Sequence, residues 1–517
     1  MRIFYAECET QYGLDLIHKL QTSSELDIVW AGSHMKTWKL DVLKKKPSFD
    51  TINVLDSKTL YKRSILRECH QDVFVRIDKP VLDYFVEIEQ DFYTLTDRSN
   101  FKSVTFRERK RYFRDLIRFW IGFLQKEKID GVYFPYAPHV AWGLVLYQAA
   151  RYLGVKCYYF SHTAINNRSL IRTNFHEIER VPDEYLQDYS LESLKQEIPQ
   201  DLLEDFYADS IVTNAVISEN DEFNKQTINI KNIQMDTVNK KSERSFKMKV
   251  RAKVGGLYKE LFKRDERVHF LPLAMDEDST RKTWKNEGRK HDAVAKKTKE
   301  YYDLNAKNVD LSAHYVYFAM HLQPEQTTQP EAGVFEDHLL VLETIVSALP
   351  DDFFVYVKEN PRQFDTSINR VSAQHFRDIT DLREYIATSD KVKLLPQSSR
   401  TDDLIENAYV CVTQTGTVGW ECLTSGKPCI TFGLPWYSGC GSCLDVTNVD
   451  EFGKALTAVK SHTPEIVKIN VLKYLHYYQD KLFIGSLSDP TNVPYNTVPY
   501  TDLIKGHAQE IITKYNV

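Results

Sequence analysis

Short apolar runs and longer amphipathic stretches alternate along the first 170 residues. The apolar runs are typical of buried strands, and they fall at residues 2–7, 27–32, 51–56, 131–135 and 155–162. Apolar residues at helical spacing fill intervals between them, at residues 12–21, 106–126 and 139–153. Strands that alternate with helices form a parallel sheet with helices on both faces. We therefore expect a Rossmann-like domain over residues 1–215.

The same alternation resumes after a long polar interval. Strands are predicted at residues 315–320, 353–358, 392–395, 409–413 and 428–432, and helices at 335–349, 382–388, 402–407 and 418–425. This pattern predicts a second Rossmann-like domain over residues 309–465. Residues 216–308 lack regular apolar runs and are expected to form an insertion or linker of helices and loops. Residues 466–517 are expected to form helices that pack back across both domains.

The predicted fold class is α/β, with two doubly wound Rossmann-like domains that face a central cleft and a charged helical insertion between them. Two such domains followed by crossing C-terminal helices describe the GT-B architecture. The active site is then expected in the cleft, at the carboxyl ends of the strands. The pattern by itself also fits other two-domain α/β enzymes, including non-hydrolysing sugar-nucleotide epimerases.

The composition is that of a folded enzyme without disulfides or membrane spans. Of its 517 residues, 42% are hydrophobic and 27% are charged. No apolar stretch reaches the about 18 residues of a membrane-spanning helix, and the first residues enter a strand without the features of a signal peptide. Eight cysteines, mostly scattered, are typical of reduced cytosolic thiols. Cys440 and Cys443 lack the second CxxC pair of a structural zinc site, so we expect a metal-free loop in a cytoplasmic protein.

Positive charge is concentrated in one part of the chain. Residues 240–299 contain 19 Lys and Arg against 9 Asp and Glu, although the whole chain has a net charge of -5. One interpretation is a solvated helical face. The other is peripheral binding to an anionic membrane surface, where each well-placed cation contributes about 1 kcal/mol. The net charge and the absence of a recognised fold disfavour nucleic acid as a partner.

The most informative motif follows the predicted strand that ends at Thr413. Thr415, Gly416 and Thr417 form a turn of small residues that opens a helix, where free N–H groups and two hydroxyls favour an anion. Glu421 falls one turn further along and is placed to reach ribose hydroxyls or a base edge. A plain strand–turn–helix connection is the alternative interpretation.

Two further candidates come from other strand ends of the second domain. Lys358 ends a strand before a polar turn and is placed to neutralise a phosphate, unless it is a solvated loop residue. Glu325 follows the first strand of this domain and is a candidate acid or base. In the irregular segment, the acidic run at 276–278 is interpreted as a solvated turn rather than a metal site.

In the first domain, polar residues follow two predicted strands. His139 and His162 lie at these strand ends and are candidate catalytic groups, with a structural role as the alternative for each. Arg168 and Arg172 come shortly afterwards and are suited to an anionic sugar or phosphate of an acceptor.

Taken together, these motifs resemble the capsule polysaccharide biosynthesis family, which includes bacterial capsule Kdo transferases. The strong part of the resemblance covers about residues 315–440. It rests on HLQPE at 321–325 with Pro330, VKENP at 357–361, LIENA at 404–408, QTGTVGWE at 414–421, GKP at 426–428, FG at 432–433 and WY at 436–437. The YFPYAPH stretch at 133–139 resembles the family less specifically.

The resemblance implies a GT-B glycosyltransferase that moves a sugar from a nucleotide-sugar donor to a capsular or cell-surface polysaccharide or glycolipid. It implies donor binding in the C-terminal domain, acceptor binding in the N-terminal one, and no metal or other cofactor. Lys358, Asn360 and the 415–417 turn would then hold phosphate, and Glu421 the nucleoside. Relatives usually have His where this chain has Asn360, which puts a CMP-linked donor in doubt because Asn carries no positive charge. The alternatives are a teichoic-acid-type CDP-polyol phosphotransferase and a non-catalytic glycan-assembly protein.

Overall fold

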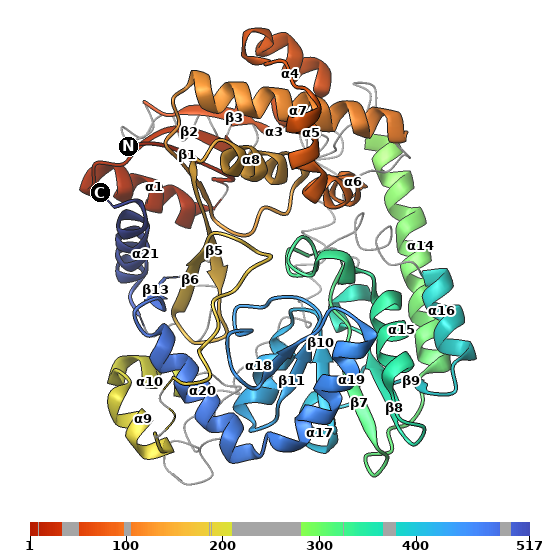
Figure 1. Ribbon diagram of the computed structural model, residues 1–517. Coiled ribbons are helices and arrows are strands. Elements are labelled where there is room, and N and C mark those ends of the chain that lie inside the picture. The colour runs from red at the N-terminus through yellow and green to blue at the C-terminus, as the bar shows by residue number, and fades with distance from the viewer. Residues whose placement is uncertain are drawn as a thin grey trace, which may run out of the picture.

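The computed structural model describes residues 1–8, 10–33, 51–97, 105–185, 187, 189–208, 281–323, 325–364, 379–485 and 498–516. Within these residues the chain forms two sheets that lie one above the other in Figure 1. Helices cover both faces of each sheet, as four separate clusters of buried apolar residues show. The predicted α/β fold with two doubly wound Rossmann-like units is therefore confirmed.

The first sheet has seven strands in the order β13-β6-β5-β4-β1-β2-β3. All neighbours are parallel except β5–β6 and β6–β13, which are antiparallel. The strands are β1 (Arg2–Tyr5), β2 (Asp27–Ser33), β3 (Asn53–Asp56), β4 (Gly131–Phe134), β5 (Lys156–His162), β6 (Arg168–Arg172) and β13 (Phe483–Ile484).

One face of the first sheet carries long buried helices, and the other carries the two ends of the chain. On the first face pack α6 (Glu89–Asp97), α7 (Phe106–Lys126) and α8 (Ala141–Tyr152). On the second face, α1 (Gln11–Ser23) packs beside α21 (Tyr500–Tyr515). Tyr515 reaches the sheet and donates a hydrogen bond from its hydroxyl to the Val132 carbonyl at 2.8 Å. Three short helices, α3 (Ser57–Tyr61), α4 (Arg63–Cys69) and α5 (Lys79–Phe85), complete this part.

The second sheet is wholly parallel and has the order β12-β11-β10-β7-β8-β9. Its strands are β7 (Tyr315–Ala319), β8 (Phe354–Lys358), β9 (Val392–Leu394), β10 (Val410–Thr413), β11 (Cys429–Thr431) and β12 (Cys443–Asp445). The remaining helices are α9 (Leu191–Glu197), α10 (Gln200–Ala208), α14 (Arg281–Asn305), α15 (His338–Ala348), α16 (Ile379–Thr388), α17 (Thr401–Asn407), α18 (Thr417–Thr424), α19 (Val449–Ala458) and α20 (Pro464–Tyr478).

The chain crosses between the two sheets at several places. Residues of α9 and α10, which precede residue 215, pack into the core of the second sheet with α18 and α20. The C-terminal residues return to the first sheet, where β13 pairs with β6. The predicted domain boundaries remain predictions. Of the predicted insertion, residues 216–280 lie outside the described residues, as does the main part of the basic segment 240–299, so its membrane role stays a prediction.

Two negative findings apply to the described part of the chain. No helix there is long and apolar enough to cross a membrane. Seven cysteines there are buried free thiols, including Cys440 and Cys443.

Helix α7 lies so close to the backbone before α5 that Gly122 of α7 has no room for a side chain. A Cβ at Gly122 in α7 would lie 1.8 Å from the Val73 carbonyl oxygen, whereas one at Gly453 in α19 would meet nothing closer than 3.9 Å. We expect Gly122→Ala to lower the free energy of unfolding by about 1–3 kcal/mol through overpacking. Gly453→Ala is the control and should be neutral or stabilising by up to about 1 kcal/mol. Urea denaturation measures both, and equal stabilities of the two variants would contradict the packing described.

Candidate functional site

The second sheet reverses its winding direction between β7 and β10. From β7 the chain adds β8 and β9 on one side, and from β10 it adds β11 and β12 on the other. Ligands of open α/β sheets bind outside the carboxyl ends of the strands at such a switch point. His321 follows β7 and Thr413 ends β10, so both lie at this position.

A hydrogen bond joins the two strand ends at the switch point. His321 Nε2 lies 2.9 Å from Thr413 Oγ1 and accepts the Thr415 N–H at 3.4 Å. Because Nε2 accepts from a backbone N–H, this nitrogen carries no proton, and the Thr413 hydroxyl donates to it. The same hydroxyl oxygen accepts the Gly416 N–H at 3.2 Å. The buried imidazole is thus assigned as neutral and holds the turn in place.

The turn at 415–417 has room for glycine alone at its centre. A Cβ at Gly416 would lie 2.6 Å from His321 Nε2 and 2.8 Å from Thr413 Oγ1. Tyr437 donates a hydrogen bond to the Gly416 carbonyl, and the Thr415 hydroxyl donates to the Thr327 carbonyl. Gly416 is the N-cap of α18, and Thr417 begins the helix as an exposed residue. The predicted anion-binding turn is therefore rigid, with its exposed hydroxyl at the start of a helix.

Lys358 and Glu421 lie near each other beside this turn. Lys358 ends β8, is 9% exposed, and donates from Nζ to the Ser399 carbonyl at 2.6 Å and to Thr401 Oγ1 at 3.0 Å. Burial lowers the Lys358 pKa, and the negative charge of Glu421 acts in the opposite direction. Glu421 accepts a hydrogen bond from Thr417 Oγ1 at 3.4 Å. The structure therefore brings together Lys358 from one predicted motif with Thr417 and Glu421 from another.

Glu325 and Asn360 lie in the loops that leave β7 and β8. Glu325 is partly exposed and accepts from the Thr327 hydroxyl at 3.4 Å, while its own N–H donates to Thr328 Oγ1 at 3.2 Å. The Asn360 N–H donates to Glu359 Oε1 at 2.8 Å, just before the 3₁₀ turn Pro361–Phe364. Both residues are held by local loop contacts at the edge of the switch point.

Glu331 is a candidate that sequence reasoning missed. Burial between the two halves of the molecule raises its pKa to about 7, Glu325 adds to this effect, and the positive charge of Arg172 opposes it. The Glu331 carbonyl also lies close to Gly433, where an added Cβ would come within 2.5 Å of the Thr415 side chain. Glu331 therefore lies between the 415–417 turn and Arg172. Nothing in its loop sequence signals this position, because it depends on how the halves pack.

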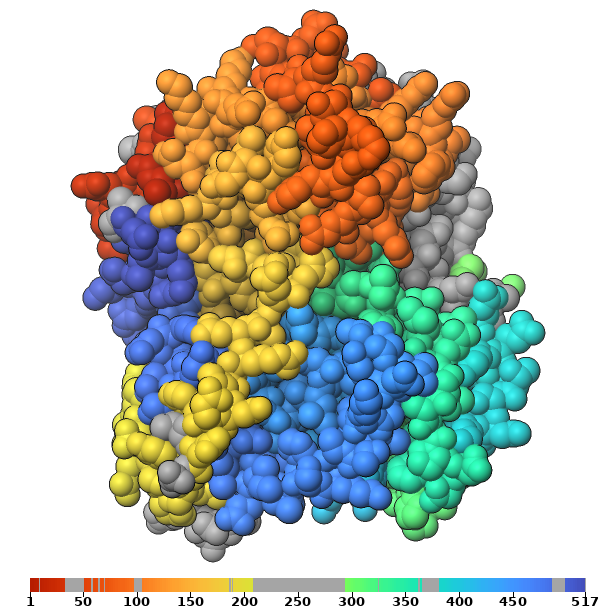
Figure 2. Space-filling view, viewed as in Figure 1, coloured from red at the N-terminus to blue at the C-terminus, as the bar shows by residue number. Residues whose placement is uncertain are grey.

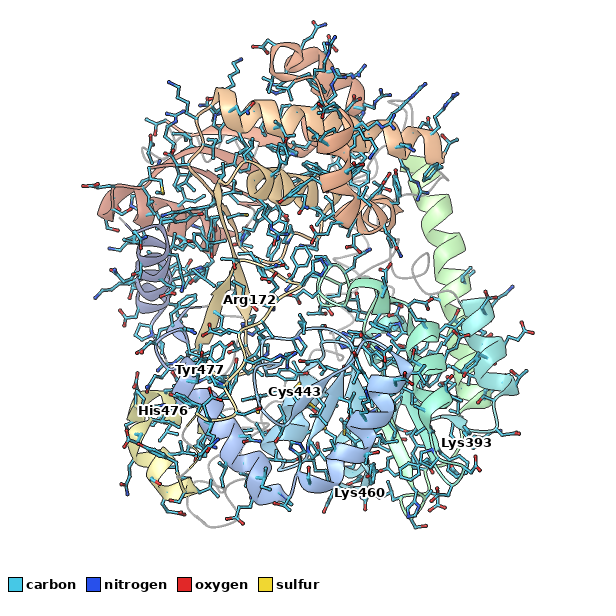
Figure 3. All side chains as sticks on the ribbon, viewed as in Figure 1. Arg172, Lys393, Cys443, Lys460, His476 and Tyr477 are labelled. Atoms are coloured by element: carbon cyan, nitrogen blue, oxygen red, sulfur yellow. The ribbon has the colours of Figure 1, made fainter. Side chains whose placement is uncertain are left out.

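The two predicted arginines have different surroundings. Arg168 is buried and donates to Asp205 Oδ2 at 2.5 Å and to Asp201 Oδ2 at 2.8 Å. This network gives Arg168 a structural role instead of the predicted acceptor contact. Arg172 lies at the other end of β6, between the two sheets (Figure 3), and donates to the Leu434 carbonyl at 3.2 Å. Of the two arginines, Arg172 is thus the one that reaches the second half beside the turn.

The two predicted histidines lie at strand ends of the first sheet, as expected. The His162 side chain is exposed to solvent at the end of β5, yet surrounding protein atoms lower its pKa through desolvation. His139 is only 3.0 Å from the Ala137 carbonyl through Nδ1, and its ring packs edge-on against Tyr136. These contacts hold His139 in its own loop.

The first sheet has its own switch point, between β1 and β4, and it holds a second residue that the sequence did not reveal. Glu7 follows β1, is 3% exposed, and has a φ of 56°, a left-handed conformation that is uncommon outside glycine. A Cβ at Gly143 in α8 would lie 3.4 Å from Glu7 Oε1, so the carboxylate faces the start of that helix. Strained backbone of this kind clusters at functional sites.

The described residues contain no group of three or more His, Cys, Asp or Glu placed to hold a metal ion. Lys358, the hydroxyls of the turn and the N-terminus of α18 are suited to an anion. The expected independence from metal remains a prediction.

Comparison with known proteins supports the resemblance suggested by the motifs. Residues 284–477 match the family described as capsule polysaccharide biosynthesis protein, which confirms that resemblance. A capsule polysaccharide modification protein, LipA, of Neisseria meningitidis serogroup B is 30% identical over 92 residues, or 18% of this chain. A serogroup A counterpart is 30% identical over 87 residues, or 17% of this chain. The aligned stretches span only 13% and 12% of those two proteins.

The solved structures that match are distant in sequence and have low TM-scores. The β-Kdo 2,7 transferase KpsC of Thermosulfurimonas dismutans is 11% identical with a TM-score of 0.29, over 93% of this chain and 99% of that one. A UDP-GlcNAc 2-epimerase of Methanocaldococcus jannaschii, solved with UDP-GlcNAc and UDP, is 11% identical with a TM-score of 0.24, over 92% and 100%. Similarities at this level carry no conclusion about activity.

The raised pKa of Glu331 predicts a pH-dependent stability. A carboxyl with a pKa of about 7 in the folded protein, above the 4.5 of an unperturbed Glu, destabilises the fold as pH rises from about 4.5 through 7. We expect Glu331→Gln to match the parent at pH 5 and to be more stable at pH 8. A tenfold change in the acid dissociation constant corresponds to about 1.4 kcal/mol. Because Glu331 is partly exposed, we expect the variant to gain about 1–2 kcal/mol in the free energy of unfolding at pH 8.

Thermal unfolding at both pH values measures this difference. Glu343→Gln, an exposed residue of α15, is the matched control and should behave as the parent at both pH values. A Glu331→Gln variant that tracks the parent at pH 8 would show that this carboxyl is not buried between the halves.

Proposed function

Since residues 284–477 carry the sequence of the capsule polysaccharide biosynthesis family, we propose that this protein is a glycosyltransferase. It moves a sugar from a nucleotide-sugar donor to a growing capsular or cell-surface polysaccharide or glycolipid. The observation that carries the proposal is the rigid 415–417 turn at the switch point of the second sheet, with Lys358 and Glu421 beside it.

The donor occupies the carboxyl edge of the second sheet in this proposal. Its phosphates lie at the start of α18, where the exposed Thr417 hydroxyl and the helix dipole favour negative charge. Lys358 contributes a positive charge one strand beyond β7, and Asn360 a hydrogen-bonding amide in the next loop. Glu421 lies one turn into α18 and accepts hydrogen bonds from the nucleoside.

Transfer breaks the bond between the sugar anomeric carbon and the leaving phosphate oxygen. The new bond joins that carbon to an acceptor hydroxyl, whose proton passes to a base, while the phosphate leaves with the bonding electron pair. The helix dipole and Lys358 stabilise the charge that develops on the phosphate, so no metal is needed. Glu325, the predicted acid or base, and His162 and His139, the other predicted catalytic residues, are candidates to take this proton, and Glu7 and Glu331 join them. A pKa of about 7 suits Glu331 for this role.

The acceptor approaches from the first sheet. Arg172 supports this assignment because its guanidinium lies between the sheets and contacts the Leu434 carbonyl, directly after Gly433. Gly433 in turn packs against Thr415. An acidic acceptor bound at Arg172 is therefore adjacent to the proposed phosphate site.

Nucleotide release tests this function. The purified protein is incubated with CMP-, CDP-, UDP-, GDP- and dTDP-linked donors, first alone and then with surface glycan. Release of one nucleotide that glycan stimulates is the expected result and identifies the donor class. CMP release from a CDP-polyol would replace the proposal by polyol-phosphate transfer. Nucleotide binding without release from any donor would favour a non-catalytic glycan-assembly protein.

A single substitution tests the nucleoside assignment. Glu421→Ala removes the carboxylate without disturbing the core, because the side chain is only partly buried at the sheet edge. Loss of a hydrogen-bonded charge contributes about 1.5–3 kcal/mol, so we expect nucleotide affinity to fall by roughly 10- to 100-fold. Calorimetric titration with the nucleotide that the donor panel identifies measures the change.

Glu384→Ala provides the control for this substitution. Glu384 is an exposed residue of α16, and its described hydrogen bond uses the backbone carbonyl. Its removal should leave nucleotide affinity unchanged. Equal affinities of the Glu421→Ala and Glu384→Ala variants would exclude Glu421 from the nucleoside site.

A further inference from the structure

A cavity of about 250 Å³ lies where the first sheet meets the C-terminal helices. Its walls are the outer edge of β6, the segment after β6, the loop at Trp436, and residues at or just beyond the ends of α20 and α21. In Figure 2 the segment after β6, coloured yellow, runs across the second half of the molecule. Ligand pockets usually measure about 300–1,000 Å³, so this smaller cavity suits one or two sugar rings.

One wall of the cavity is an open strand edge. β13 pairs with β6 only at Arg168 and Ser169. In the described part of the chain no strand pairing continues along the same side of β6, where Leu170, Ile171 and Arg172 line the cavity. An unpaired edge presents backbone N–H and C=O groups. These groups are suited to a ligand that carries many hydroxyls.

The other walls combine aromatic rings with short polar side chains. Trp436 and Tyr478 lie on the side of the second sheet, and Tyr158 lies on β5. Thr173 and Asn174 add a hydroxyl and an amide. Trp436 and Tyr478 are largely buried, at 7% and 5% exposed, so the partly exposed Tyr158 supplies most of the aromatic contact for a sugar ring, and a few placed polar groups fix orientation. This lining therefore favours carbohydrate over an apolar ligand.

The charges of the cavity point to an acidic carbohydrate. Three cations line it beside two carboxylates, Glu177 and Glu179, so the lining keeps a small net positive charge. Two of the cations have carboxylate partners: Lys481 with Glu179 at 2.5 Å, and Lys514 with Glu510 at 3.2 Å. Arg172 instead donates to the carbonyls of Leu434 and Glu177. Arg172 also interacts electrostatically with Glu331, and its remaining N–H groups are suited to charge-assisted hydrogen bonds with a carboxylate or phosphate.

Arg172 also connects the cavity to the proposed transfer site. It lines the cavity and contacts Leu434, which follows the glycine packed against Thr415. We propose that this cavity binds the acidic acceptor glycan, with the sugar rings along the open edge of β6 and the end to be extended beside Arg172. This inference rests on the proposed glycosyltransferase function, and it names the path and the chemical class of the acceptor.

A blocking substitution tests the path. Thr173 is exposed and lines the cavity, so Thr173→Trp fills it without removing a packed side chain. The probe is an oligosaccharide fraction released from the surface polysaccharide of the source cells, and saturation-transfer NMR and titration measure its binding. We expect Thr173→Trp to weaken binding at least tenfold. Glu184→Trp, an exposed residue of the same segment outside the cavity, should bind as the parent does.

A second variant tests the charge. Lys514→Gln removes one cavity cation from a partly exposed position on α21. We expect it to weaken binding of the native oligosaccharides several-fold and to leave binding of their carboxyl-reduced forms unchanged. Equal affinity of the parent for native and carboxyl-reduced forms would overturn the acidic assignment.

The outcomes separate this inference from the proposed function. Absence of oligosaccharide binding by the parent, or equal binding by the Thr173→Trp and Glu184→Trp variants, would overturn the cavity assignment. Nucleotide binding and release, measured on the same samples, report separately on the donor site. Oligosaccharide binding that Thr173→Trp removes, in a protein that releases no nucleotide, would support the cavity and contradict the transferase.

Discussion

The hydrogen bond between His321 and Thr413 ties together the two strands at which the second sheet reverses direction. The 415–417 turn of the candidate donor site is positioned by this bond. It holds Thr413 so that its oxygen accepts the Gly416 N–H, and it fixes the turn that begins α18. A neutral, buried imidazole is suited to this task, because a protonated ring would place a second donor against the Thr415 N–H.

Polar contacts join the two halves of the molecule. Arg172 from β6 donates to the Leu434 carbonyl, and Gln329 reaches Asp91 of α6 at 3.4 Å. Burial raises the pKa values of Asp91 and Glu336 to about 6 and about 8, as it does for Glu331. Three carboxyl groups with raised pKa values thus lie along one boundary, and their ionisation at higher pH opposes folding.

Periodicity in the sequence predicts strands β1 to β5 and β7 to β11, because buried parallel strands give apolar runs and their helices give regular spacing; the short edge strands β12 and β13 give no such signal. It also placed Thr415, Gly416, Thr417, Lys358 and Glu421 at strand ends that the topology brings together. It did not predict β6, whose ends Arg168 and Arg172 were interpreted as a basic pair and instead face different surroundings. The sequence does not identify Glu7 and Glu331 as site residues, because segments distant in the chain form their surroundings and no local pattern encodes these contacts.

The place of α21 has a consequence for how the protein is made. Tyr515 hydrogen-bonds to the Val132 carbonyl and the His507 ring lies 2.5 Å from the Tyr133 hydroxyl, so residues nearly 400 positions apart share one buried layer. β13 likewise adds the last strand to a sheet that begins at Arg2. During synthesis on the ribosome, the part of this face that α21 covers therefore stays exposed beside α1 until residues 500–515 have emerged. The nascent N-terminal half must be protected from aggregation throughout that interval.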